Sequence, residues 1–215
     1  MELSITLTII IATSIISFLG FNNRTLLNNL IFYPPAITEN NQWYRFFTCG
    51  LIHADWGHLL FNMYALYIFG EPVEKAFIEI FGENGKTFYL LMYTSSLLAC
   101  LLPSFSKHKN NSNYRSLGAS GAVSAVVFAF IILFPLQKMG LIFIPVMIPG
   151  FIFGLIYLIA SSIFEKRAKD NVNHSAHIWG GIYGIGFLIV FGFYLSDYPI
   201  LQEFINSVSS YLKNF

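Results

Sequence analysis

Charged side chains are scarce in this chain of 215 residues: they make up 11% of the sequence, whereas hydrophobic residues make up 55%. Soluble domains carry about 25% charged residues, and long apolar runs are typical of helices that cross a bilayer. The net charge is only +1, so the charge balance gives no argument for a nucleic-acid or strongly acidic partner. The composition therefore predicts a protein that lies mostly within a membrane.

Cysteine is scarce as well. Cys49 and Cys100 are the only two, too few for a disulfide framework to be read from their spacing, and we expect free, buried thiols. The basic region that begins a signal peptide is also missing, because the acidic Glu2 precedes the first apolar run. We therefore expect this run to be retained as a first membrane span.

Six apolar stretches are bounded in the way expected of membrane spans. An open sheet cannot satisfy its backbone in lipid, so we predict an all-α membrane protein, a bundle of six transmembrane helices in a single domain over residues 1–215. The expected spans are Leu3 to Phe21, Gly57 to Phe69 with a more polar continuation to Phe81, Thr87 to Leu102, Ser116 to Phe134, Gly140 to Phe164 with interruptions at Pro145 and Pro149-Gly150, and His174 to Leu195.

The connections between these stretches differ in character. Residues 22–56 form a long first connection rich in Asn, Phe, Tyr and Leu, which we expect to pack along the membrane surface. Residues 196–215 form a mixed C-terminal tail for which a helix is one possibility, without a clear signal. Because successive spans alternate in direction, the first, third and fifth connections lie on the same side of the membrane.

Four polar residues begin spans on that side. Ser120 lies about four residues in from the third connection, His177 about four in from the fifth, and His58 and Asn62 follow the first. At about 1.5 Å per residue, these groups lie roughly 5–10 Å below one membrane face. His58 and Asn62 are four residues apart and share a helix face. Polar groups within spans are costly and are usually functional, so this agreement in depth indicates a site.

Small residues indicate how two of the spans meet. Gly180 and Gly184 form a Gly-x-x-x-Gly spacing, which lets helix backbones approach closely in lipid. We expect this pair to press the sixth span against the fourth, with Gly118 and Gly121 on the facing side. Such an approach would bring a serine hydroxyl and an imidazole within hydrogen-bond reach, as proton abstraction requires.

A hydroxyl beside an imidazole makes a nucleophile and a general base. Ser120 would attack a carbonyl carbon, and His177 would accept its proton and pass it to the leaving amine. The candidate donors to the resulting oxyanion are His58, Asn62 and the backbone N–H of Ser120. Asp170 lies in a charged loop and is expected to be a solvated charge, so the pattern favours a Ser–His dyad over a triad.

These motifs together resemble the rhomboid family of intramembrane serine proteases, over most of the chain from Trp43 to about Gly186. The similar stretches are Gly118-Ala119-Ser120-Gly121 for the nucleophile, His53 to Asn62 for the second span, Ala176-His177-Ile178-Trp179-Gly180 with Gly184 for the base, Trp43-Tyr44-Arg45 for the first connection, and Gly70 with Glu74 at the end of the second span.

The resemblance implies a serine endopeptidase without a cofactor or metal, acting on single-span or membrane-anchored proteins in or near their spanning segment. It implies a water-filled cavity and a mobile fifth span, which Pro145 and Pro149-Gly150 would suit as a lateral gate. It gives His58 and Asn62 the oxyanion role. Trp43 and Arg45 are expected to have structural roles, as is His53 in tying down the first connection.

One position departs from the family pattern. Family members often place an aromatic residue four positions after the nucleophile, against the catalytic imidazole, and here that position is Ser124. We therefore expect the His177 ring to be held by the Ser124 hydroxyl or by an aromatic such as Tyr183.

Three other functions are compatible with parts of the pattern. A metalloprotease would need His-Glu-x-x-His, whereas His53 and His58 are five apart without a Glu between them and are expected to diverge around the helix. A proton-coupled transporter or channel would place its polar groups near the midplane, with a path to both faces. An inactive rhomboid-like chaperone that binds membrane helices would lose Ser120 or His177, and both are present.

Two arguments about orientation disagree. The resemblance implies a bacterial plasma-membrane enzyme whose site opens away from the cytoplasm. The positive-inside rule would instead place the face with more Lys and Arg, which is the face of the site, in the cytoplasm. Eight basic residues lie on that face and four on the other: Arg24, Arg45, Lys107, Lys109, Arg115, Lys166, Arg167 and Lys169 against Lys75, Lys86, Lys138 and Lys213.

Overall fold

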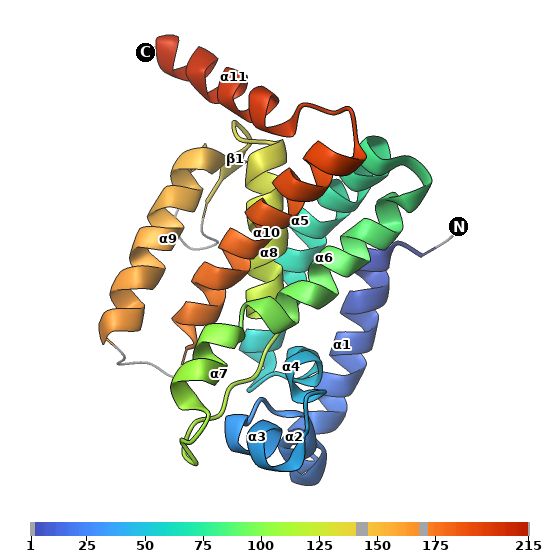
Figure 1. Cartoon of the computed structure of the whole chain (residues 1–215), viewed down its shortest axis with the longest axis vertical. Coiled ribbons are helices and arrows are strands. Elements are labelled where there is room, and N and C mark those ends of the chain that lie inside the picture. Colours follow the sequence, from blue (N-terminus) through green and yellow to red (C-terminus); the bar gives the residue numbers. More distant parts are fainter. Residues whose placement is uncertain (1–2, 141–145, 168–171, 215) are drawn as a thin grey trace.

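The computed structural model describes residues 3–140, 146–167 and 172–214, which are mainly α-helical, as predicted (Figure 1). The longer helices form a bundle, and the short ones gather at one end of it. The α-helices are α1 (Ile5–Phe21), α2 (Arg24–Leu30), α3 (Pro34–Asn40), α4 (Arg45–Thr48), α5 (Trp56–Phe81), α6 (Gly85–Ala99), α7 (Leu102–His108), α8 (Ser120–Leu133), α9 (Gly150–Arg167), α10 (His174–Leu195) and α11 (Ile200–Lys213). The 3-10 helices are η1 (Cys49–Leu51) and η2 (Gly82–Asn84), and the strands are β1 (Lys138–Met139) and β2 (Ile148–Pro149).

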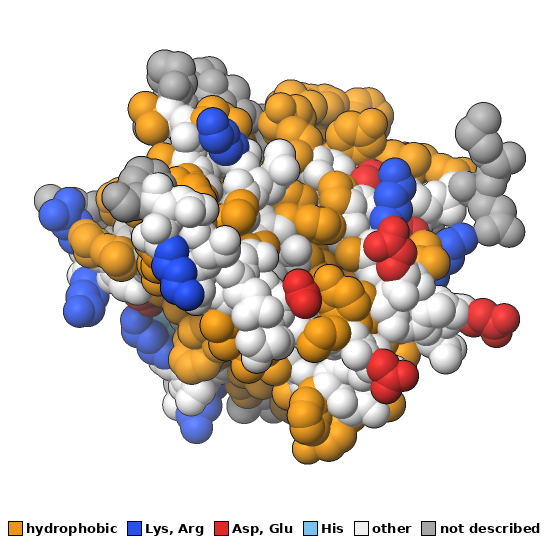
Figure 2. All heavy atoms as spheres, turned by 90° about the horizontal axis from the view of Figure 1, so that it is seen from above, with side chains coloured by type: hydrophobic (Ala, Val, Ile, Leu, Met, Phe, Trp, Pro, Cys, Tyr) orange, Lys and Arg blue, Asp and Glu red, His pale blue; other side chains and the backbone are white. Residues whose placement is uncertain are grey.

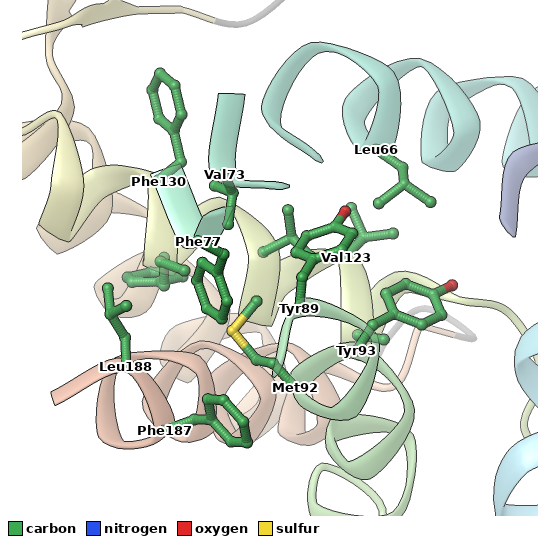
Figure 3. Close-up of a cluster of buried hydrophobic side chains, with 14 of the residues drawn as sticks. Leu66, Val73, Phe77, Tyr89, Met92, Tyr93, Val123, Phe130, Phe187 and Leu188 are labelled. Carbon is green, nitrogen blue, oxygen red and sulfur yellow. The ribbon is translucent and has the colours of Figure 1, made fainter. Parts of the chain in front are cut away.

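Helix α8 is the core of the bundle. It packs against α5, α6, α9 and α10, and 11 of its 14 residues are buried. Figure 3 shows the apolar cluster around it, in which Val123 of α8 lies among side chains from three neighbouring helices, such as Phe77, Met92 and Leu188. Because α8 is enclosed by protein, its position in the molecule is fixed on nearly every side.

Two stretches in the described part of the chain are long and apolar enough to cross a membrane by length and composition. One is the continuous helical run 56–108, which contains α5, η2, α6 and α7, and the other is α10. Helices α1 and α8 are apolar but shorter. Large apolar side chains such as Leu60, Ile159 and Val190 are exposed on the outer faces of the bundle. Such apolar helices and surfaces are typical of an integral membrane protein.

The first connection is folded rather than extended. It contains α2, α3, α4 and η1, and a buried arginine of α4 ties this helix to α2 and to the turn that follows α3. The Arg45 guanidinium donates to the carbonyl oxygens of Asn28 and Ile31, both at 2.8 Å, and to the side chain of Gln42. A buried charge is stable only when its donors are satisfied, and this set of acceptors meets that need.

Aromatic rings attach this connection to the bundle. The Trp43 ring stacks on Phe46, with centroids 5.9 Å apart, and also contacts Phe105 of α7. Phe46 packs edge-on against both Phe105 and Phe32. Trp43 and Arg45 therefore have structural contacts in this connection, close to the end of the bundle where α8 and α10 begin.

A buried carboxylate on α5 holds the start of α1. Glu74 accepts hydrogen bonds from the backbone N–H groups of Ile5 and Thr6, and from the Thr6 hydroxyl, all at 2.8 Å. The first N–H groups of a helix lack partners within the helix, and negative charge is favoured there. The glutamate at the far end of the second span therefore fastens α1 to α5.

Two expected spans begin later in the structure than the sequence indicates. Helix α8 begins at Ser120 rather than Ser116, because Ser116 pairs with Phe32 of the first connection and Gly118 takes a left-handed backbone with φ of 112°. The span expected from Gly140 begins as a helix only at Gly150.

The start of α9 is set by a short hairpin that the sequence did not indicate. Strands β1 and β2 pair antiparallel, so residues 138–139 and 148–149 are extended. Pro149-Gly150 therefore stands where the helix begins and does not interrupt it, and Pro145 lies outside the described residues.

The C-terminal tail forms an amphipathic helix. In Figure 1, α11 lies across the end of the bundle that is opposite α2, α3 and α4. Its buried Ile200 and the ring contact between Tyr211 and Phe151 attach it to the bundle. Figure 2 views the molecule from this end, where acidic and basic side chains are scattered among hydrophobic ones.

Candidate active site

The structure brings Ser120 and His177 together. Ser120 is the first residue of α8, and His177 lies in the first turn of α10, at the same end of the bundle. The Ser120 Oγ and His177 Nε2 atoms are 2.7 Å apart, a hydrogen-bond distance. Both residues are partly exposed, so a reacting group can reach them. The pair has the geometry that a nucleophile and its general base need.

Glycines on α10 make this distance possible. A Cβ atom added to Gly180 would lie 2.0 Å from the carbonyl oxygen of Gly121, and one added to Gly184 would lie 2.2 Å from that of Ala125. The two backbones are thus in direct contact, as the Gly-x-x-x-Gly spacing predicts. Gly121 itself faces the Cys100 sulfur, 2.4 Å from a Cβ built there.

The turn before the nucleophile is shaped by Gly118. A Cβ on this residue would lie 2.6 Å from Cε1 of His58, and its positive φ favours glycine. Its N–H donates to the carbonyl oxygen of Cys49 at 2.9 Å. Gly118 therefore faces His58 and the first connection, and the expectation that it faces the sixth span was wrong.

His53 holds the residue next to the nucleophile. Its Nε2 atom accepts a hydrogen bond from the Ala119 N–H at 3.3 Å, so the ring proton must be on Nδ1, which lies 2.9 Å from the Ser17 hydroxyl. Ser17 in turn donates to the carbonyl oxygen of Leu51. Burial, and next the proximity of His58, lower the pKa of His53 to about 3. The ring is therefore neutral and links α1, the first connection and the nucleophile turn.

The two histidines of the second-span motif lie side by side. Their ring centroids are 4.9 Å apart, edge to face, so the expectation that His53 and His58 diverge was wrong. This proximity does not make a metal site of His53, because its two ring nitrogens already bond to Ser17 and Ala119. Within the described ranges, no group of three or more His, Cys, Asp or Glu side chains could hold a metal ion.

His58 lies against the nucleophile turn, and Asn62 follows it one turn later on α5. Asp55 caps α5 by accepting from the His58 N–H at 2.8 Å, which fixes the first turn of this helix. The buried Asn62 donates from Nδ2 to the His58 carbonyl oxygen at 2.9 Å. An amide nitrogen carries two hydrogens, and this bond accounts for one of them. The N-cap residue of α8, Ala119, provides no side-chain hydrogen bond to the first turn, which begins at Ser120.

An aromatic ring from α9 lies beside the imidazole. The Tyr157 and His177 ring centroids are 6.3 Å apart with planes tilted by 31°, and the Tyr157 and Ser124 hydroxyl oxygens are 2.9 Å apart. Tyr183 instead donates to Ser95 of α6 at 2.8 Å. The sequence did not indicate Tyr157, because this residue lies 20 positions before His177 and on a different helix. The available signal was that Tyr157 shares a face of α9 with the small residues Gly154 and Ser161.

Two surface hollows lie outside this constellation. One, of about 270 Å³, is lined by α9 residues such as Leu158 and Lys166, and the other, of about 430 Å³, lies between α10 and α11. Neither is lined by Ser120 or His177. The water-filled cavity implied by the family resemblance stays a prediction, and Asp170 lies outside the described residues.

Comparisons with a family model and with individual proteins point to the same family. The family model described as Rhomboid domain matches residues 40–194. RHOMBOID-like protein 12, mitochondrial, of Arabidopsis thaliana is 29% identical over 170 residues, which are 74% of this chain and 49% of that protein. The putative rhomboid protease YdcA of Bacillus subtilis is 29% identical over 154 residues, 71% of this chain and 68% of that protein.

A third relative extends the comparison. Rhomboid-like protein 11, chloroplastic, of Arabidopsis thaliana is 31% identical over 165 residues, 73% of this chain and 54% of that protein. The matches thus span about half the length of the two plant relatives and about two thirds of the bacterial one. The matched region contains the nucleophile turn with Ser120, the pair His53 and His58, and His177 of α10.

Proposed function

Because the chain belongs to the rhomboid family, we propose that it is an intramembrane serine endopeptidase that uses a Ser120–His177 dyad. One observation carries this proposal: the Ser120 Oγ and His177 Nε2 atoms are 2.7 Å apart at the same end of the bundle. The relatives named as proteases support the class of activity, and the contact between Ser120 and His177 in this chain supports the dyad.

The proposed reaction begins with proton transfer. His177 Nε2 accepts the Ser120 proton while Oγ bonds to the carbonyl carbon of the scissile peptide, and the carbonyl oxygen becomes an oxyanion. The imidazolium then gives the proton to the leaving amine, and the C–N bond breaks to leave an ester on Ser120. A water molecule, deprotonated by the same imidazole, hydrolyses this ester and restores both residues.

We assign the oxyanion to donors on two elements. The backbone N–H of Ser120 lies at the start of α8, where aligned peptide dipoles favour negative charge. Asn62 and His58 approach from α5, and contact between His58 and the Gly118 turn supports their placement beside the nucleophile. Donors fixed before the reaction stabilise the transition state without reorganisation, and removing one typically costs about 10²–10³-fold in rate.

The proposed substrates are single-span or otherwise membrane-anchored proteins, cut in or near the spanning segment. Helices α1, α5, α6, α8, α9 and α10 would supply the six spans. A substrate helix would enter between spans, beside α9, and would need to unwind there because a stable helix hides its carbonyl groups in backbone hydrogen bonds. Gly150, at the junction of β2 and α9, is a natural pivot for such movement.

An inactive helix-binding protein of the same family is the main alternative. Some relatives carry the name rhomboid-like rather than rhomboid protease. The presence of both dyad residues and their hydrogen bond favours the enzyme, since helix binding alone has no need of a serine bonded to a histidine.

Reaction with a fluorophosphonate probe tests the proposal. We expect wild-type protein in detergent to become covalently labelled, and Ser120→Ala and His177→Ala to lose labelling, because the probe needs an activated serine. Gel fluorescence after fixed times is the measurement. Labelling of Ser120→Ala at the wild-type level would remove the nucleophile assignment and with it the proposed activity.

We propose that the site opens away from the cytoplasm in a bacterial plasma membrane. The charge bias that argues otherwise includes residues with structural partners: Arg45 is buried among carbonyl groups and Lys107 lies 3.7 Å from Glu165. Ser112→Cys, near the site, should react with a membrane-impermeant thiol reagent in intact cells. Glu83→Cys, exposed at the opposite end, is the matched control and should react only after permeabilisation. Native Cys49 and Cys100 are buried. The reverse labelling pattern would place the site in the cytoplasm.

A further inference from the structure

We propose that Tyr157 of α9 is a positioning residue for the catalytic imidazole, so that His177 is correctly oriented only while α9 is docked against α8. The inference rests on the proposed function and adds a residue to it. The Tyr157 ring lies 6.3 Å from that of His177, within the range of about 4.5–7 Å in which aromatic pairs interact. It limits rotation of the imidazole away from the Ser120 hydroxyl.

The tyrosine is held on α8 by its hydroxyl. The Tyr157 and Ser124 oxygens are 2.9 Å apart, and either group can donate. Ser124 lies four residues after Ser120 on α8, so nucleophile and anchor share one helix face. Because Ser124 is buried, breaking this bond without replacing it leaves polar atoms unsatisfied. The Tyr157 ring is therefore held against the same helix that carries the nucleophile.

Apolar contacts fix the remaining sides of the ring. Phe128 of α8 meets Tyr157 edge-on at 5.6 Å, and Phe153 of α9 lies 6.3 Å away. One turn earlier on α9, Gly154 is buried, and a Cβ there would lie 3.1 Å from Ile131 of α8. The two helices thus approach closely just before Tyr157, which leaves its ring little freedom.

The opposite face of α9 has a different character. Leu155, Ile156 and Ile159 are more than half exposed, as expected of a lipid-facing surface. Figure 1 shows α9 at the edge of the bundle, where it packs against α8 and α10. If α9 moves outward, the Tyr157 ring leaves His177 and its hydroxyl leaves Ser124 in the same step. Helix docking and orientation of the base are coupled through one side chain.

The labelling rate constant of the fluorophosphonate probe tests this coupling. Tyr157→Leu should lower it roughly 10–100-fold, the size of effect that small misplacements of catalytic groups produce. Tyr157→Phe and Ser124→Ala each remove one partner of the same hydrogen bond and should each lower it roughly fivefold. The double variant should be no worse than either, because both changes remove one interaction.

The matched control is Tyr183→Leu. Tyr183 of α10 makes a comparable hydrogen bond to a serine, Ser95 of α6, and its ring contacts Phe187 of the same helix. We expect this variant to label at the wild-type rate. Cleavage of a membrane-anchored substrate should show a reduced kcat for Tyr157→Leu with little change in KM.

Each outcome decides the proposal. Wild-type labelling rates in Tyr157→Leu, or equal losses in Tyr157→Leu and Tyr183→Leu that follow a common fall in Tm, would overturn the positioning role while leaving the dyad intact. An altered KM with unchanged kcat and labelling would assign Tyr157 to substrate entry instead. Absence of Ser120-dependent labelling in the wild type would reject the proposed protease itself.

Discussion

Alanine at Ser120, at His177 or at both should lower the rate of peptide-bond cleavage to the same floor, at least about 10⁴-fold below wild type. The reason is that the two side chains act as one unit across a 2.7 Å contact. Once the hydroxyl is gone, the imidazole has no proton to accept, and once the imidazole is gone, the hydroxyl is a weak nucleophile. Steady-state cleavage of a membrane-anchored substrate by the three variants is the measurement.

The cleavage rate of the double variant is the informative measurement. If the two residues contributed independently, its loss would be the product of the single losses, whereas a shared step makes the three losses equal. Thermal unfolding in detergent serves as the control, since Ser120→Ala removes one partly exposed oxygen and should leave Tm nearly unchanged. A loss in the double variant equal to the product of the two single losses would contradict the dyad. A Ser120→Ala variant that still cleaves at a tenth of the wild-type rate would contradict it as well.

Gly184→Val should destabilise the folded protein by about 3 kcal/mol or more. A Cβ at this position would lie 2.2 Å from the Ala125 carbonyl oxygen, and a backbone atom cannot rotate aside as a side chain can. Helices α8 and α10 must then separate, which also stretches the contact between the dyad residues. At about 2–4 °C per kcal/mol for a chain of this size, Tm should fall by roughly 6–12 °C.

Gly186→Val is the matched control for this change. Gly186 lies two residues further along the same helix, and nothing lies within 4 Å of a Cβ built there. Replacing glycine in a helix interior by another residue is usually favourable when space is available, so Tm should stay equal or rise slightly. Equal Tm values for the two variants would show that the α8–α10 contact is looser than the structure has it.

Much of this arrangement follows from local pattern. Apolar length and helix breakers located the main helices, and the common depth of Ser120 and His177 indicated that they meet. Gly180 and Gly184 predicted a close helix crossing because small residues have that effect wherever helices pack in lipid. These features depend on residue type and spacing along one helix, which a sequence displays directly.

What the sequence did not reveal depends on contacts between distant segments. The late start of α8 follows from pairing of Ser116 with Phe32, and the late start of α9 from the β1–β2 hairpin. The tautomer of His53 depends on an N–H donated by Ala119, 66 residues away. The ring beside His177 comes from Tyr157 on another helix. No periodicity along the chain encodes such pairs.

The length of α8 has a consequence for where cleavage occurs. Its 14 residues span about 21 Å, less than the hydrocarbon thickness of about 30 Å, and its neighbours shield it from lipid. Helix α8 can therefore begin at Ser120 below the membrane surface without exposing polar backbone groups to hydrocarbon. Under the proposed function, Ser120 is held at a fixed depth in the membrane. Moving a helical substrate along its axis by one residue changes the depth of each of its peptide bonds by about 1.5 Å. The depth of a peptide bond in the membrane, as well as the side chains beside it, therefore selects the bond that is cut.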